Sequence, residues 1–96
     1  MPAPYSFSTI AEQATISATG TRAQLASISG RTFFIRNAKA SAGTAYLGGS
    51  DVTTGGGGKV MIDLQPGEGI FLDLTNPSGL WVVAGSTATV YLTGLS

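Results

Sequence analysis

The sequence predicts an all-β fold, a small antiparallel β-sandwich or barrel with jelly-roll or other Greek-key wiring and about eight short strands. Three observations predict it. Apolar and polar residues alternate with a period of two in at least five segments. Turn residues (Gly, Pro, Asn and Ser) recur about every 8–12 residues, the spacing typical of sandwiches and barrels. No segment keeps a helical apolar period over about ten residues, so we expect almost no helix.

The alternation places the strands one by one. They are expected at 15–17, 22–28, 31–36, 44–47, 59–64, 70–74, 80–84 and 87–93. Pro66 and Gly67, between the fifth and sixth strands, suit the two central positions of a type II turn. The segment 80–84 is apolar on both faces, which predicts a central strand covered on both sides. These strands make one domain over 14–96.

Residues 1–13 are expected to form an extended N-terminal arm ahead of this domain. Two early prolines, Pro2 and Pro4, remove backbone donors and disfavour helix. Tyr5, Phe7 and Ile10 alternate with polar residues, so one edge of the arm is apolar. Apolar side chains on a chain terminus are stabilising only when they dock, so we expect the arm to contact its own domain or a neighbouring molecule.

The charge content indicates a protein that works in an assembly. Only 10% of the 96 residues are charged and the formal net charge is +0, against roughly 25% charged residues in an ordinary soluble domain. A surface with so little charge favours association. The chain has no Cys, so disulfides cannot stabilise this small domain. We therefore expect a homo-oligomer, most plausibly a trimer.

The composition also argues against several functions. Five scattered cations do not make the basic surface that nucleic-acid binding needs. No apolar stretch approaches the roughly 20 residues of a membrane span. His and Cys, the usual ligands of transition metals, are both absent. We expect no nucleic acid, membrane, metal or other cofactor.

Catalytic residues are not apparent in the sequence. Hydroxyl groups are abundant, but there is no His to activate them, and Lys39 and Lys59 lie in or beside glycine-rich loops that hold geometry poorly. Asp63 and Asp73 fall on the polar faces of two strands that are expected to neighbour each other, so they are candidates for a carboxylate pair. Solvated surface carboxylates are the stronger interpretation. We expect that the protein is not an enzyme.

A glycine-rich segment, 48–58, interrupts the strands most strongly. The run Gly55 to Gly58 is costly to order, so this run is expected to be an exposed, mobile tip. A phosphate-binding loop would need a Lys followed by Ser or Thr at the start of a helix, whereas Lys59 leads into a strand.

Two aromatic residues in the second half are candidates for surface contacts. Trp81 lies in an apolar strand, where half-buried packing is the commoner role. Alternatively, Trp81 joins Tyr46, Tyr91 or Phe71 in an aromatic surface for a protein or a sugar. Tyr91 is expected to point outward. The candidate assembly contacts are Tyr5, Phe7, Ile10, Trp81 and Tyr91.

Several segments together resemble small structural proteins of tailed bacteriophages. The segments are 31–37 (RTFFIRN), 45–53 (AYLGGSDVT), 64–68 (LQPGE), 80–85 (LWVVAG) and 88–90 (ATV), and the resemblance spans roughly residues 20–93. A hydrophobic strand ending in Arg-Asn before a Gly-Gly-Ser-Asp-Val-Thr loop is its most specific part. This chain departs from the pattern at Gly55 to Gly58, where a short loop of apolar residues and Pro is usual.

The resemblance implies a virion component without catalytic residues. It implies a head decoration (cement) protein that is made in the host cytoplasm and resides on the capsid surface. Such a protein binds the major capsid protein across capsomer junctions. The alternative is a small tail or fibre module that binds a receptor or a carbohydrate.

Overall fold

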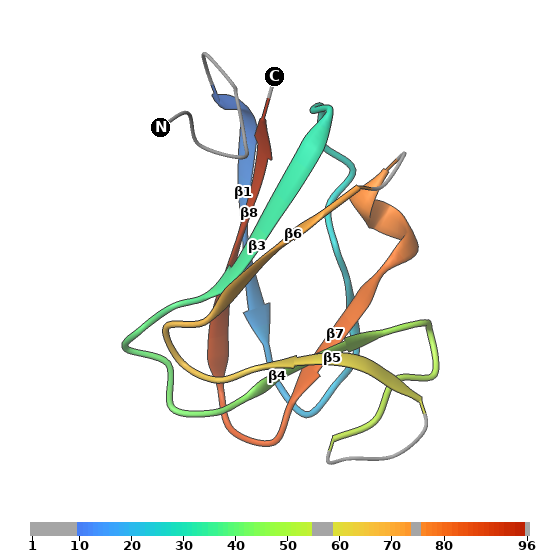
Figure 1. Cartoon of the computed structure of the whole chain (residues 1–96). Coiled ribbons are helices and arrows are strands. Elements are labelled where there is room, and N and C mark those ends of the chain that lie inside the picture. The colour runs from blue at the N-terminus through green and yellow to red at the C-terminus, as the bar shows by residue number, and fades with distance from the viewer. Residues whose placement is uncertain (1–9, 55–58, 74–75, 96) are drawn as a thin grey trace.

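The structure, a computed structural model, describes residues 10–54, 59–73 and 76–95. They form eight strands in two four-stranded antiparallel sheets, so the predicted fold class is confirmed (Figure 1). The strands are β1 (Ile10–Ala18), β2 (Ala23–Gln24), β3 (Thr32–Asn37), β4 (Ala45–Gly48), β5 (Val60–Leu64), β6 (Gly69–Leu72), β7 (Trp81–Ala84) and β8 (Ala88–Leu95). A 3₁₀ turn, η1 (Pro77–Gly79), precedes β7. The described residues include no helix that could span a membrane.

The strand order is that of a jelly roll, an alternative that the sequence left open. One sheet has the order β1-β8-β3-β6 and the other β2-β7-β4-β5. A jelly roll can be described as one long antiparallel hairpin that is rolled into two sheets. The strand pairs of such a hairpin are all present here: β1–β8, β2–β7, β3–β6 and β4–β5. Pairing of β3 with β8 and of β4 with β7 closes each sheet. The loop between β4 and β5 is therefore the tip of the hairpin, and β1 and β8 are its open end.

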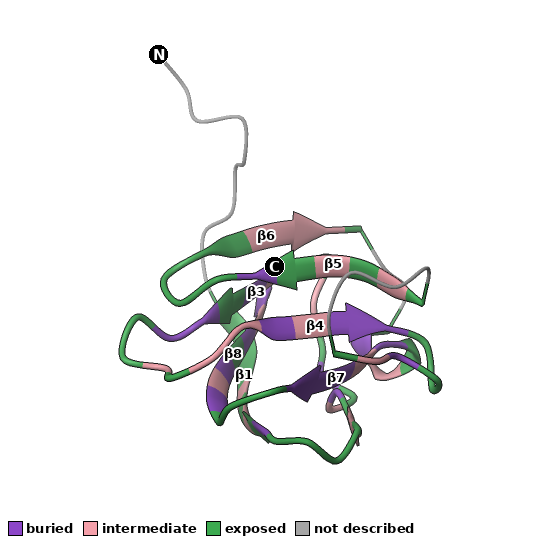
Figure 2. Cartoon of the chain, turned by 90° about the horizontal axis from the view of Figure 1, so that it is seen from below, coloured by how far each residue is buried: buried purple, intermediate pink, exposed green. Residues whose placement is uncertain are grey.

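The core lies between the two sheets and follows the predicted period of two. Phe33 and Ile35 of β3 and Leu92 of β8 point inward from the β1-β8-β3-β6 sheet and are fully buried. Leu47 and Val82 face them from the second sheet and are also fully buried. Figure 2 shows the buried residues gathered in β4, β7 and β8, with β5 and β6 more exposed. Strand β7, expected to be covered on both faces, lies between β2 and β4.

The predicted turn at Pro66 and Gly67 is present. Gly67 has φ +91°, and the amide of Glu68 donates to the carbonyl of Gln65 at 2.9 Å. A positive φ at the third turn position suits a type II turn and favours Gly. This turn carries the chain from β5 in one sheet to β6 in the other.

Asn37, at the end of β3, connects the two sheets from a fully buried position. Its Nδ2 donates to the carbonyls of Gly43 and Leu64, each at 2.9 Å. Its own amide donates to the carbonyl of Glu68, and its carbonyl accepts from the amide of Gly67, both at 2.9 Å. One residue thus holds two of the connections that cross between the sheets at this end, 38–44 and 65–68, which run side by side in Figure 1.

The boundary between arm and domain differs from the expected one. Residues 10–13, assigned to the arm, form the first part of β1, where Ile10 pairs with Leu95 and Gln13 with Thr93. All four are exposed because β1 is an edge strand there, so no alternation of burial marks them in the sequence. The rest of the expected arm, including Tyr5 and Phe7, lies outside the described residues.

The second strand is shorter than expected. The sequence predicted a strand at 22–28, but only Ala23 and Gln24 pair with β7. Leu25 and Ile28 are both buried, three residues apart, which is not a strand period. Residues 25–31 instead pass from one sheet to the other. There the amide of Leu25 donates to the carbonyl of Leu80, and the amide of Arg31 to that of Leu95.

We predict that Asn37→Ala lowers the free energy of unfolding by about 2–4 kcal/mol, because it leaves the carbonyls of Gly43 and Leu64 without their donor. Urea unfolding of the variant and of the unaltered chain measures this change in the free energy of unfolding. Thr44→Val is the matched control at the same end of the sandwich: it removes only the exposed bond to Gln65 and should change stability by less than about 0.5 kcal/mol. Equal effects of the two variants would contradict the role given to Asn37.

Candidate interaction surfaces

The outer faces of the two sheets divide the outward-facing aromatic residues into two groups. The register of the β1-β8-β3-β6 sheet places Phe34, Phe71 and Tyr91 on its outer face. The register of the other sheet places Trp81 and Tyr46 on its outer face, where Trp81 pairs with Gly48 and Tyr46 with Val83. The two faces of a sandwich point in opposite directions. No single contact surface on one sheet can therefore include both Trp81 and Tyr91.

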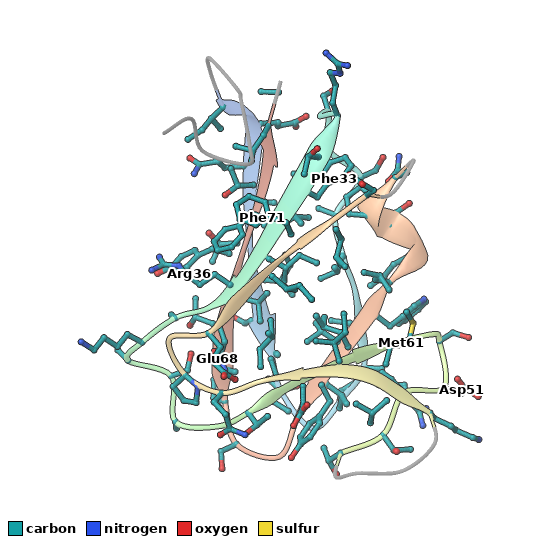
Figure 3. All side chains as sticks on the ribbon, viewed as in Figure 1. Phe33, Arg36, Asp51, Met61, Glu68 and Phe71 are labelled. Carbon is teal, nitrogen blue, oxygen red and sulfur yellow. The ribbon has the colours of Figure 1, made fainter. Side chains whose placement is uncertain are left out.

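The first surface, here the aromatic face, consists of Phe34, Arg36, Phe71 and Tyr91. Phe34 and Phe71 are paired across β3 and β6, with ring centroids 4.6 Å apart and a 42° angle between the rings. Arg36 and Tyr91 are paired across β3 and β8, and the guanidinium carbon lies 5.1 Å from the centre of the Tyr91 ring. These are a tilted aromatic pair and a cation–π contact in adjacent positions. Figure 3 shows Arg36 and Phe71 on the same side of the molecule, away from Met61 and Asp51.

Gly69 allows Phe34 to cover β6. Gly69 is paired with Arg36 at the start of β6, and a Cβ atom built there would collide with the ring of Phe34. The missing side chain leaves room for the ring to lie over the strand, so Gly69 has a packing role rather than a turn role. Phe34 is only partly buried in this position.

Polar but uncharged side chains surround the aromatic face. A shallow depression of about 430 Å³ is lined by Tyr91, Arg36 and Phe34 together with Gln13, Thr15 and Thr93. Tyr91 is 38% exposed. Tyr, Phe and Arg are enriched at protein interfaces, where other charged residues are depleted, and Tyr and Arg are frequent hot-spot residues. This composition is typical of a surface that another protein covers.

The second surface is a depression of about 590 Å³ over the other sheet, here the Trp81 depression. Trp81 and Val83 of β7 lie beneath it. Gly20, Thr21 and Arg22 border it from the turn after β1. Ser50, Val52, Thr53 and Thr54 border it from the loop after β4.

Part of the glycine-rich segment, ahead of the tip expected at Gly55 to Gly58, packs onto the sheet. Val52 is fully buried, and its carbonyl accepts a hydrogen bond of 2.6 Å from Nε of Arg22. Gly48 is buried beneath the loop, and a Cβ there would lie 2.5 Å from the carbonyl oxygen of Lys59 and 3.0 Å from Val52. The sequence did not reveal the burial of Val52, because no apolar residue lies two positions before or after it to form an alternating pattern. Gly55 to Gly58 lie outside the described residues.

The structure separates the other candidates. Ile10, 53% exposed, lies at the start of β1. Asp63 belongs to β5 and Asp73 follows β6, and these strands lie in different sheets, so the expectation that they neighbour each other is wrong. The oxygen Oδ1 of Asp73 accepts from the hydroxyl of Thr32 at 3.5 Å. Asp51 pairs instead with Lys59, at 3.5 Å between Oδ2 and Nζ on the exposed surface.

The sequence interpretation missed Arg36 as a surface residue and the pairing of Phe34 with Phe71. The alternation of residues in these two strands could have indicated the pairing. It directs Phe34 and Phe71 outward, because the residues before and after each of them point into the core. In the part of the chain that the structure describes, no three His, Cys, Asp or Glu side chains are grouped as metal ligands would be. Comparisons with protein-family models, with curated proteins and with solved structures find no match to the chain.

We predict that Val52→Ala lowers the free energy of unfolding by about 1.5–3 kcal/mol, because a fully buried branched side chain loses its apolar contacts. Thermal or urea unfolding measures it. The matched control is Met61→Ala on β5, where the side chain is 68% exposed and the effect should stay below about 0.5 kcal/mol. A neutral Val52→Ala would mean that residues 49–54 do not pack on the sheet in solution.

Proposed function

We propose that this chain is a structural protein of a tailed-bacteriophage virion. Its role would be that of a capsid decoration (cement) protein, which stabilises the head by binding the major capsid protein across capsomer junctions. The observation that carries the proposal is the aromatic face, an outer sheet surface that combines three aromatic rings with the cation of Arg36. The resemblance of residues 20–93 to small phage structural proteins supports the same assignment, and the jelly roll is a fold found among viral capsid domains.

The aromatic face suits a cement protein for a physical reason. A cement protein must gain its binding energy from a small area, because a 96-residue domain presents only a small area to the capsid. In such an interface a few buried Tyr, Trp and Arg side chains supply most of the binding free energy. Tyr91 and Arg36 are already in contact across β3 and β8, so little side-chain entropy remains to be lost on docking.

The proposal includes a homo-oligomer, with a trimer as the most plausible form, on the capsid surface after synthesis in the host cytoplasm. A trimer would match the three-fold and quasi-three-fold positions between capsomers. The low charge of the chain favours such association. The alternative is a tail or fibre module that binds a receptor or a carbohydrate, and the observation that favours it is the Trp81 depression.

We predict that Tyr91→Ala reduces occupancy on purified capsids by about 10-fold or more, because a central aromatic anchor is lost. Its melting temperature should change little, since Tyr91 is 38% exposed. Co-sedimentation of the chain with capsids that lack it measures the occupancy. Met61→Ala, an exposed site on the other sheet, should bind as the unaltered chain does. Unchanged occupancy of Tyr91→Ala would remove the aromatic face from the docking surface.

The arm provides a second prediction. Because the described part of β1 begins at Ile10, a truncation of residues 2–9 leaves every described strand whole. We expect this truncation to weaken capsid attachment, because Tyr5 and Phe7 each contribute about 2 kcal/mol when fully buried. Melting temperature and capsid occupancy, measured on the same truncated protein, separate two outcomes. Lower occupancy at an unchanged melting temperature identifies an anchor, whereas a lower melting temperature with full occupancy shows that the arm docks on its own domain.

A further inference from the structure

The Trp81 depression has walls that the fold holds in place. The turn after β1 and the loop after β4 both lie at the end of the sandwich opposite the start of β1 and the end of β8 (Figure 1). The hydrogen bond from Nε of Arg22 to the carbonyl of Val52, 2.6 Å long, joins these two segments. Buried Val52 secures one wall, and Val83, 3% exposed, belongs to the floor. The depression therefore lies between segments that are fixed to each other and to the sheet.

The polar groups around this depression are available for a ligand. Within the described residues, no side-chain hydrogen bond is made by the hydroxyls of Thr21, Ser50 or Thr53 or by the indole N–H of Trp81. In the described part of the chain, Oδ1 of Asn37 is the one buried side-chain N or O atom that has no partner. The indole nitrogen has no partner either, so it must be accessible to solvent rather than buried. Arg22 uses Nε for Val52, which leaves its two terminal nitrogens as donors.

We propose that the Trp81 depression binds a neutral saccharide. An indole ring offers an apolar surface to the C–H groups of a sugar and a donor at its edge. The free hydroxyls both donate and accept, as sugar hydroxyls do, and the guanidinium adds further donors. The volume of about 590 Å³ is within the range of small-molecule sites. The free hydroxyls and the guanidinium can bind the polar groups of a sugar, whereas an apolar protein surface would cover them and leave them without partners.

This inference is independent of the proposed cement role, and it gives the alternative role, binding of a carbohydrate, a defined site and ligand class. The aromatic face lies on the β1-β8-β3-β6 sheet and the Trp81 depression on the opposite outer face. A domain that docks through the aromatic face would present the depression to solvent. Sugar binding by the isolated chain can therefore be tested without capsids, and either activity can fail while the other holds.

The chain contains one Trp, so its intrinsic fluorescence reports on this site. The test is a titration of the full chain with glucose, galactose, mannose and N-acetylglucosamine, each up to about 50 mM, far above the roughly 1 mM Kd of a weak site. We expect at least one of them to change the emission of Trp81 in a saturable way. No change with any of the four sugars would overturn the proposal.

Two variants show whether the change arises in the depression. Thr53→Val and Ser50→Ala remove one free hydroxyl each and should raise the Kd about 2- to 10-fold, the factor for one lost neutral hydrogen bond. Thr87→Val, an exposed site between β7 and β8, is the matched control and should leave the Kd unchanged. Equal affinities of all three variants would overturn the assignment. So would a change of emission caused by capsids and by none of the sugars, because it would assign the depression to a protein contact.

Discussion

The side chain of Asn37 joins the two sheets of this sandwich at two of the places where the chain crosses between them. Its amide group donates to Leu64 of β5 and to Gly43 ahead of β4, while its backbone binds the turn before β6. Buried carbonyl groups must find donors, and these crossing segments have no strand neighbour to supply them. The remaining oxygen, Oδ1, has no partner among the described residues. The four bonds nevertheless hold together the end of the jelly roll on which the register of β3, β5 and β6 depends.

That register decides which surfaces the protein presents. Because Asn37 points into the sandwich, its neighbour Arg36 must point out, and pairing with β8 places it over Tyr91. The same alternation turns Phe34 outward to meet Phe71. A shift by one residue would bury Arg36 and expose Asn37, so the inward polar anchor also protects the outward aromatic face. The Arg-Asn pair that ends β3 thus links the stability of the fold to the surface proposed for docking.

The low charge of the chain has consequences for both surfaces. Around the aromatic face the neighbours are Thr and Gln, and around Trp81 they are Ser and Thr. Such side chains are less strongly hydrated than charged ones, so covering them is less costly, provided that their hydrogen bonds are replaced. A partner protein and a sugar meet this condition in different ways. The face with three aromatic rings suits the first, and the face with Trp81 and free hydroxyls suits the second.

The alternation of apolar residues by itself determined the fold class, most of the strands, the type II turn at Gly67 and the outward direction of Tyr91. These are local properties, set by the period of the side chains and by turn chemistry. Only the tertiary structure decided the jelly-roll wiring, the separation of Trp81 from Tyr91, and the burial of Val52. It also moved the start of β1 to Ile10, because an exposed edge strand has no burial pattern to read. Each of these features depends on which strands and loops contact one another. Such partners lie far apart in the chain, and the periodicity of the sequence does not encode which of them pair.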